Sequence, residues 1–145
     1  MLQLLGLAKN VQKYALFAGP HLDTVVDAEH GIALIGDASH PLSGAFGTGA
    51  GFALEDAWTL AESVEWAYEQ GANLAAGLRL FDKVRSPHYA ALYKVLDRYR
   101  EVAIKANEAN LDFDQDVEFR IKGTWSDQED WIQQYDVSSI WYWHD

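Results

Sequence analysis

The stretch that decides the fold is GDASHPLSGAFGTGAGFALEDA, which runs from Gly36 to Ala57. It follows a compact apolar run, GIALIG at 31–36, and its last residues open a segment with helical spacing. A strand that ends in Gly-Asp and leads through a glycine-rich loop into a helix places backbone N–H groups and a positive helix end where an anion or an electron-rich ring can lie. A flexible loop capped by Asp37 explains the same composition, and spacing alone does not decide between the two interpretations.

The loop itself carries little side-chain bulk. Because glycine has no Cβ, a planar ligand can approach its main chain closely. The carboxylate of Asp37 is expected at the carboxyl end of the strand, where open α/β sheets bind ligands, and it can accept hydrogen bonds from sugar-like hydroxyl groups. The glycines concerned are Gly44, Gly47, Gly49 and Gly51.

The residues before the loop are predicted to form strands. The segment VQKYALFAG, at 11–19, has a short β-leaning centre, and GIALIG suits a strand that is buried on both faces. The residues between them, PHLDTVVDAEH, favour a connection with one turn of helix. We therefore expect strands within 10–36 and the loop at 37–50.

The residues after the loop, 51–107, are predicted to be helical. Apolar residues recur at helical spacing until Gly71 and Asn73 end the pattern, and a second helical stretch starts at about Leu74. Pro87 either kinks this second stretch or starts a new helix. The apolar stripe predicted for the first helix is Ala53, Ala57, Leu60, Ala61, Val64, Ala67 and Tyr68. The tyrosines at 89, 93 and 99 are interpreted as core packing rather than as the wall of a substrate site.

The remaining segment, 108–145, is acidic and rich in tryptophan. It fits either a docking surface for a partner chain, since exposed aromatic residues concentrate binding energy, or a segment that wraps its own domain. We favour the second interpretation. Self-association is a further expectation, because an apolar helix face that no other element covers must find a partner surface.

Composition narrows the function classes. The length of 145 residues matches one domain, and no apolar run reaches the roughly 20 residues that span a bilayer. A net charge of −11 with scattered Lys and Arg argues against nucleic acid as a partner. The chain has no cysteine, which fits a reducing compartment, so we expect a cytoplasmic protein. The histidines show no spacing of three or four residues, so no metal site is predicted.

Three segments follow one another around the loop in this order: GDASHP, GTGAG and ALEDAWTLAES. Together they resemble the second FAD-binding motif of the aromatic-hydroxylase-like flavoprotein monooxygenases, which include salicylate and para-hydroxybenzoate hydroxylases. The flanking segments YALF, LRLFDKVRSPHY and DWIQQYD resemble the salicylate-hydroxylase branch, so the similarity covers most of residues 10–140. The resemblance implies an α/β fragment of the FAD/NAD(P)-binding (aromatic hydroxylase) fold, with a few strands followed mostly by α-helices. Residues 1–145 then form a single partial domain.

The resemblance also implies roles for individual residues. Asp37 would hydrogen-bond the ribityl chain of FAD, with Gly36 giving close access beside it. The loop from Pro41 to Gly51, Gly47 included, would pass along the isoalloxazine ring. The amides of Gly49, Ala50 and Gly51 would face its pyrimidine edge. Two positions depart from the family pattern, since Gly44 replaces a common proline and Gly51 a common asparagine, and both changes loosen the loop.

In a complete enzyme of this family, flavin reduced by NAD(P)H transfers one oxygen atom from O₂ to an aromatic or polyketide-like small molecule. No catalytic residue can be assigned here. The family's first fingerprint, Gly-x-Gly-x-x-Gly after an early strand, has no counterpart in this chain. We therefore expect a C-terminal part that binds FAD weakly or not at all without a complementing N-terminal chain.

Two alternatives stay open. One is a shortened relative without redox chemistry, acting as a small-molecule binding protein or as an isomerase or cyclase. The other is a gene model begun at an internal methionine. Among single residues, His40 either lies beside the flavin or serves as a structural hydrogen-bonder. Glu55 and Asp56 are interpreted as favourable charges in the first helical turn rather than as a catalytic pair.

Overall fold

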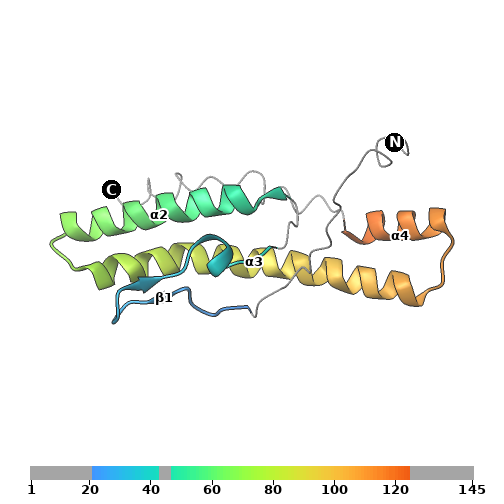
Figure 1. The fold of residues 1–145 in the computed structure, drawn as a ribbon, viewed down its shortest axis with the longest axis horizontal. Helices are drawn as coiled ribbons and strands as arrows, with labels where there is room; N and C mark the ends of the chain where they lie inside the picture. The colour runs from blue at the N-terminus through green and yellow to red at the C-terminus, as the bar shows by residue number, and fades with distance from the viewer. Residues whose placement is uncertain (1–20, 43–46, 125–145) are drawn as a thin grey trace, which may run out of the picture.

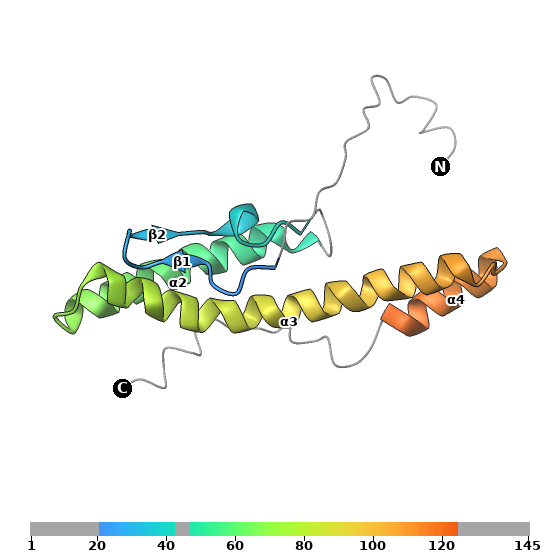
Figure 2. The same cartoon turned by 90° about the horizontal axis from the view of Figure 1, so that it is seen from below.

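The computed structural model describes residues 21–42 and 47–124, and Figure 1 shows their arrangement. A helix of 35 residues, α3 (Leu74–Glu108), is the central element. Helix α2 (Gly49–Glu69) lies along its first part, and α4 (Phe113–Thr124) lies along its last part. Two short strands and a 3₁₀ turn precede the helices, and Figure 2 shows them beside α2 and the first part of α3.

The strands form a two-stranded antiparallel hairpin. Strand β1 (Val26–Asp27) pairs with β2 (Ile32–Ala33), with Val26 opposite Ala33. The strand predicted over 31–36 is therefore shorter than expected, and it is not buried on both faces, because Ile32 is 50% exposed and Ile35 is 38% exposed. Among the described residues β2 has one pairing partner, and Gly36 at φ 57° turns the chain out of the strand direction. The segment predicted as a strand at 11–19 lies outside the described residues.

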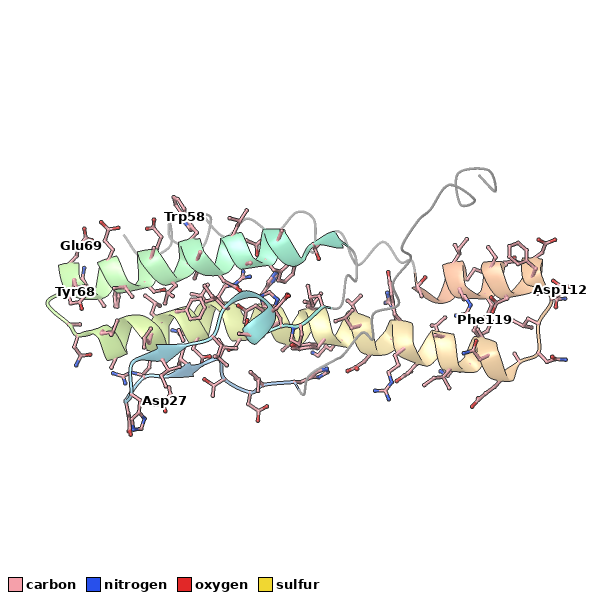
Figure 3. The ribbon with its side chains drawn as sticks, in the orientation of Figure 1. Asp27, Trp58, Tyr68, Glu69, Asp112 and Phe119 are labelled. Atoms are coloured by element: carbon pink, nitrogen blue, oxygen red, sulfur yellow. The ribbon has the colours of Figure 1, made fainter. Side chains whose placement is uncertain are left out.

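Helix α2 begins at Gly49, earlier than the predicted Gly51, and the chain leaves it through Gly71 at φ 68°. The predicted apolar stripe was wrong in part, because Ala57, Ala61 and Tyr68 are exposed. The face that meets α3 is instead mostly polar, and it consists of Phe52, Asp56, Thr59, Ser63 and Ala67. Figure 3 shows Trp58 on the opposite side of α2, pointing away from α3.

Asn73 is the N-cap of helix α3, and its side chain accepts a hydrogen bond from the Ala76 amide at 3.1 Å. It continues through Pro87 without ending, so the alternative of a new helix at this proline was wrong. Proline removes one backbone donor and crowds the preceding turn. Here Arg85, His88 and Tyr89 are buried on either side of it, and their packing outweighs that local cost.

The apolar core lies where the hairpin, α2 and the first part of α3 meet. Tyr89 and Tyr93 belong to it, as the core-packing interpretation predicted, and Tyr99 lies beyond it. The other buried members are Val25, Leu42, Phe52, Phe81 and Leu92. The predicted acidic segment after residue 107 contains the end of α3 and all of α4, none of whose residues is buried. None of the helices in the described ranges is long and apolar enough to cross a membrane.

Gly77 sets how closely α2 and α3 approach, because a Cβ at this position would lie 2.9 Å from the Ser63 carbonyl oxygen and 2.9 Å from the Val64 Cα. Both are backbone atoms, so the helices must separate to admit a methyl group. Gly77→Ala is expected to lower the free energy of unfolding by about 1–3 kcal/mol, measured by urea denaturation. Gly51→Ala is the matched control, since its Cβ meets nothing within 4 Å. Equal stability of the two variants would contradict this packing.

Candidate cofactor-contact site

The first part of the site is the turn from Gly36 to His40, which contains the 3₁₀ turn η1 (Gly36–Ala38). The amides of Ser39 and His40 both donate to the Gly36 carbonyl oxygen, at 2.9 and 3.0 Å. The left-handed backbone of Gly36 favours glycine, and an added Cβ would lie 3.4 Å from the Ala53 Cβ of α2. Gly36 is buried, whereas Asp37 is exposed at the tip of the turn. The structure therefore presents the carboxylate of Asp37 at the surface.

The second part is the start of α2. The amides of Gly49, Ala50 and Gly51 lie in its first turn, where backbone N–H groups have no acceptor within the helix. The side chain of Thr48 does not cap them, and its buried hydroxyl has no hydrogen-bond partner among the described residues. The first turn also carries no acidic residue. This helix end thus keeps its positive character.

Space is available above this main chain. A Cβ at Gly47, Gly49 or Gly51 would meet no atom of residues 21–42 or 47–124 within 4 Å, so no side chain of these residues fills the approach. Gly47 has φ 65°, where glycine is favoured, and Gly49 and Gly51 have ordinary backbone angles. Pro41 and Gly49 are half-buried, and Gly47, Ala50 and Gly51 are exposed. The turn lies near the start of α2, because Gly36 packs against Ala53 and its amide donates to Asp56. Gly44 lies outside the described residues.

Behind the turn, Asp56 of α2 is fully buried and accepts hydrogen bonds from the turn and from α3. Its Oδ2 accepts from the Gly36 amide at 2.8 Å and from the His40 ring, Nε2, at 2.7 Å. Its Oδ1 accepts from Arg85 Nε at 2.9 Å and from the hydroxyl of Tyr89. The interpretation of Glu55 and Asp56 as first-turn charges was wrong, since α2 begins at Gly49 and its first turn carries no acidic residue, and the Asp56 carboxylate faces inward.

Arg85 carries the compensating charge. It is fully buried, and its NH1 donates to Glu55 Oε2 at 2.9 Å. The guanidinium carbon also lies 5.7 Å from the ring centre of Phe52 and 5.2 Å from that of Tyr89, within the range of cation–π attraction. Two carboxylates and two aromatic rings thus surround one cation.

This environment shifts several pKa values. Burial raises the pKa of Asp56, but the hydrogen bonds from His40, Tyr89 and Gly36 and the charge of Arg85 outweigh burial and hold it below its usual value. Burial raises the pKa of Glu55, more than the Arg85 charge lowers it. Burial and the positive charge of Arg85 lower the pKa of His88 to about 4. At neutral pH the cluster therefore contains ionised Asp56 and Arg85 and neutral His88.

Of the two interpretations of His40, the geometry favours the structural hydrogen-bonder. The side chain is 0% exposed, and its ring nitrogen Nε2 is joined to Asp56. Its other nitrogen, Nδ1, is buried and has no hydrogen-bond partner among the described residues. Asp56 and Arg85 are also fully buried, so these three groups have no direct path to a dissolved substrate.

The sequence analysis did not identify the Asp56 and Arg85 pair. A signal was present, because Phe52, Asp56 and Ser63 share one helical face with Thr59 and Ala67. A charged residue on a stripe with buried neighbours indicates a paired ion, since unpaired charges are rarely buried.

Among residues 21–42 and 47–124, no group of three or more His, Asp or Glu side chains is placed to hold a metal ion.

Comparison with known proteins finds partial similarity to fungal flavoproteins. No family model and no solved structure matches the chain. FAD-dependent monooxygenase SAT7 of Stachybotrys chartarum is 44% identical over 54 residues, which are 37% of this chain and 12% of that protein. Asperlicin C monooxygenase of Petromyces alliaceus is 36% identical over 88 residues, 61% of this chain and 19% of that protein. FAD-dependent monooxygenase fmqB of Aspergillus fumigatus is 37% identical over 73 residues, which are 50% of this chain and 18% of that protein.

The chain spans less than a fifth of the length of each of these curated relatives. The similarity supports a relationship to FAD-dependent monooxygenases over part of the chain.

Proposed function

We propose that this chain is the C-terminal, FAD-contacting part of a salicylate-hydroxylase-like flavoprotein monooxygenase. The observation that carries the proposal is the open approach to the main chain at the start of α2, where a Cβ at Gly47, Gly49 or Gly51 meets no atom of the described residues within 4 Å. An exposed carboxylate, Asp37, stands on the neighbouring turn. Two relatives are named FAD-dependent monooxygenases, and this supports FAD as the proposed ligand.

The residues present fit this cofactor. The uncapped amides of Gly49, Ala50 and Gly51 can donate hydrogen bonds to an electron-rich ring edge, and the positive helix end favours negative charge there. The carboxylate of Asp37 can accept hydrogen bonds from ribityl hydroxyl groups. Gly47 and Pro41 would contribute backbone beside the ring. These contacts are polar and directional, so they orient the cofactor as well as bind it.

When bound and reduced by NAD(P)H, the flavin would supply the transfer of one oxygen atom from O₂ to a small organic substrate. An aromatic or polyketide-like substrate is the class that the family resemblance favours. The α/β FAD/NAD(P)-binding fold, a cytoplasmic location and a complementing N-terminal chain or self-association belong to the same proposal. The described elements contribute mostly helices to such a fold.

The cofactor-free isomerase or cyclase has less support. Such chemistry needs an acid or base that touches its substrate. The buried cluster places His40, Asp56 and Arg85 at 0% exposure. Glu55 is the cluster's accessible carboxylate, with a side chain 24% exposed, and its Oε2 is held by Arg85.

Titrating the full chain with FAD and following flavin fluorescence tests the proposal. We expect weak but saturable binding, because the sequence lacks the first dinucleotide fingerprint and the contacts that it makes with the ADP half. A Kd near 1 mM corresponds to about 4 kcal/mol and is the limit of what we expect. A folded chain that leaves FAD fluorescence unchanged up to about this concentration contradicts the proposal.

Gly49→Val is expected to weaken FAD binding at least about tenfold, since its side chain would stand between ligand and main chain. The protein without ligand should tolerate it, because a Cβ there meets nothing within 4 Å. Ala57→Val is the matched control, an exposed position of the same helix away from its start. The measurements are FAD affinity and thermal unfolding of both variants. Unchanged affinity in Gly49→Val would place the ligand elsewhere.

A further inference from the structure

We infer that Asp56 is a positioning residue, which fixes the turn from Gly36 to His40 and thereby the direction of the Asp37 carboxylate. The inference rests on the proposed function for its ligand, FAD. The resemblance gives Asp56 no role, and its own carboxylate is buried too deeply to touch a cofactor at the surface. Its influence must therefore pass through the turn.

One oxygen atom holds both ends of the turn. Asp56 Oδ2 accepts from the amide of Gly36, the residue before Asp37, at 2.8 Å. The same oxygen accepts from the side chain of His40, the residue that ends the turn, at 2.7 Å. Hydrogen bonds to a charged acceptor are among the stronger ones in proteins. A single carboxylate thus bridges the two ends of the turn, which the hydrogen bond from the His40 amide to the Gly36 carbonyl oxygen also joins.

Helix α3 holds that carboxylate in turn. Arg85 Nε, at 2.9 Å, and the hydroxyl of Tyr89 both donate to Oδ1, so rotation of the Asp56 side chain would break two bonds. A third attachment joins the turn to α3 directly, since the Tyr93 hydroxyl donates to the Ser39 carbonyl oxygen at 3.2 Å. The turn is thereby fastened to both helices.

Asp37 itself has no such support. It is exposed, and no described residue donates a hydrogen bond to its carboxylate. The direction of this side chain therefore depends on the backbone of the turn, including the left-handed angle of Gly36 at φ 57°. A loss of order in the turn would remove a preformed acceptor from the surface.

Amide hydrogen exchange on the full chain tests the first step without any ligand. In Asp56→Asn, the protection of the Ser39 and His40 amides is expected to fall at least about tenfold, while that of α3 beyond Val95 is kept. Asp82→Asn is the matched control, because Asp82 Oδ1 also accepts a backbone amide, that of Val25, at 2.9 Å, but does not touch the turn. Unchanged protection of Ser39 and His40 in Asp56→Asn, or equal loss in both variants, overturns the inference.

If Asp56→Asn does not fold, Tyr89→Phe replaces it in the same measurement. This variant removes one donor to Oδ1 and leaves the bonds to Gly36 and His40. A smaller loss of protection, again confined to the turn, supports the inference. Loss spread evenly over α2 and α3 overturns it.

A double-mutant comparison of FAD affinity tests the second step. Asp37→Asn and Asp56→Asn are each expected to weaken binding about tenfold, and the double variant no further, because Asp56 acts through Asp37. If the double variant instead binds FAD about a hundredfold more weakly, the two substitutions act independently, and the inference is overturned. Absence of FAD binding in the unmodified chain overturns the proposed function instead, and the exchange experiment then decides alone whether Asp56 fixes the turn.

Discussion

Arg85→Ala is expected to lower the free energy of unfolding by about 3–5 kcal/mol, because it leaves a buried carboxylate without its cation. Arg85 and Asp56 are both 0% exposed, and Arg85 Nε lies 2.9 Å from Asp56 Oδ1. Removal also frees Glu55, which NH1 contacts at 2.9 Å. Urea denaturation followed by circular dichroism measures the loss, as a lower midpoint or as the absence of a cooperative transition.

The matched control for Arg85→Ala is Arg120→Ala. Arg120 pairs with Asp116 at 2.8 Å on α4, but its side chain is 37% exposed, and water replaces such a pair at little cost. We expect the urea midpoint of Arg120→Ala to equal that of the unmodified chain. A loss in Arg85→Ala no larger than that in Arg120→Ala would show that the buried cluster does not stabilise the fold.

Acidification gives the second large effect. Burial and Arg85 lower the pKa of His88 from 6.5 to about 4. Between pH 6.5 and pH 4 the histidine is therefore protonated in the unfolded chain and neutral in the folded chain. Stability therefore falls as the pH drops from 6.5 to 4, by about 3 kcal/mol at about 1.4 kcal/mol per pKa unit. Asp56, whose pKa is lowered below 3.8, adds a further loss at still lower pH. Glu55, with a raised pKa, acts in the opposite direction and offsets part of this loss.

Urea midpoints measured across this range test the expectation. His88→Gln cannot take up the proton, so its midpoint should depend less on pH between 6.5 and 4. His30→Gln is the control, because the His30 side chain is 72% exposed. If His88→Gln and the unmodified chain lose stability in parallel, the buried neutral histidine is not the cause.

Helices α2 and α3 were readable from the sequence, but the faces that they bury were not. Strand β1 was missed, because Val26–Asp27 lies in the segment predicted as a connection with one turn of helix, and helix α4 was not predicted either. The pattern around Gly71 and Asn73 separated α2 from α3 correctly, because glycine in the left-handed region and an asparagine cap are local signals. Pro87 was misleading, since its cost is local whereas the burial of Arg85 and Tyr89 is a property of the packed helices.

The candidate site shows the same division. The glycine-rich loop and Asp37 were predicted from local composition and resemblance, and their contact with FAD stays a prediction. Asp56 was not, because its partners Gly36, Arg85 and Tyr89 are distant in sequence, and a carboxylate near a helix start has an adequate local explanation. Contacts between distant segments are what composition and periodicity do not encode.

The length of α3 has a consequence for cooperativity. A helix of 35 residues extends about 52 Å at 1.5 Å per residue, longer than either neighbour. The core cluster adjoins its first part, whereas α4 covers its last part without a single buried residue. The α3–α4 end is therefore expected to fray and re-form while the end that carries the core cluster stays intact.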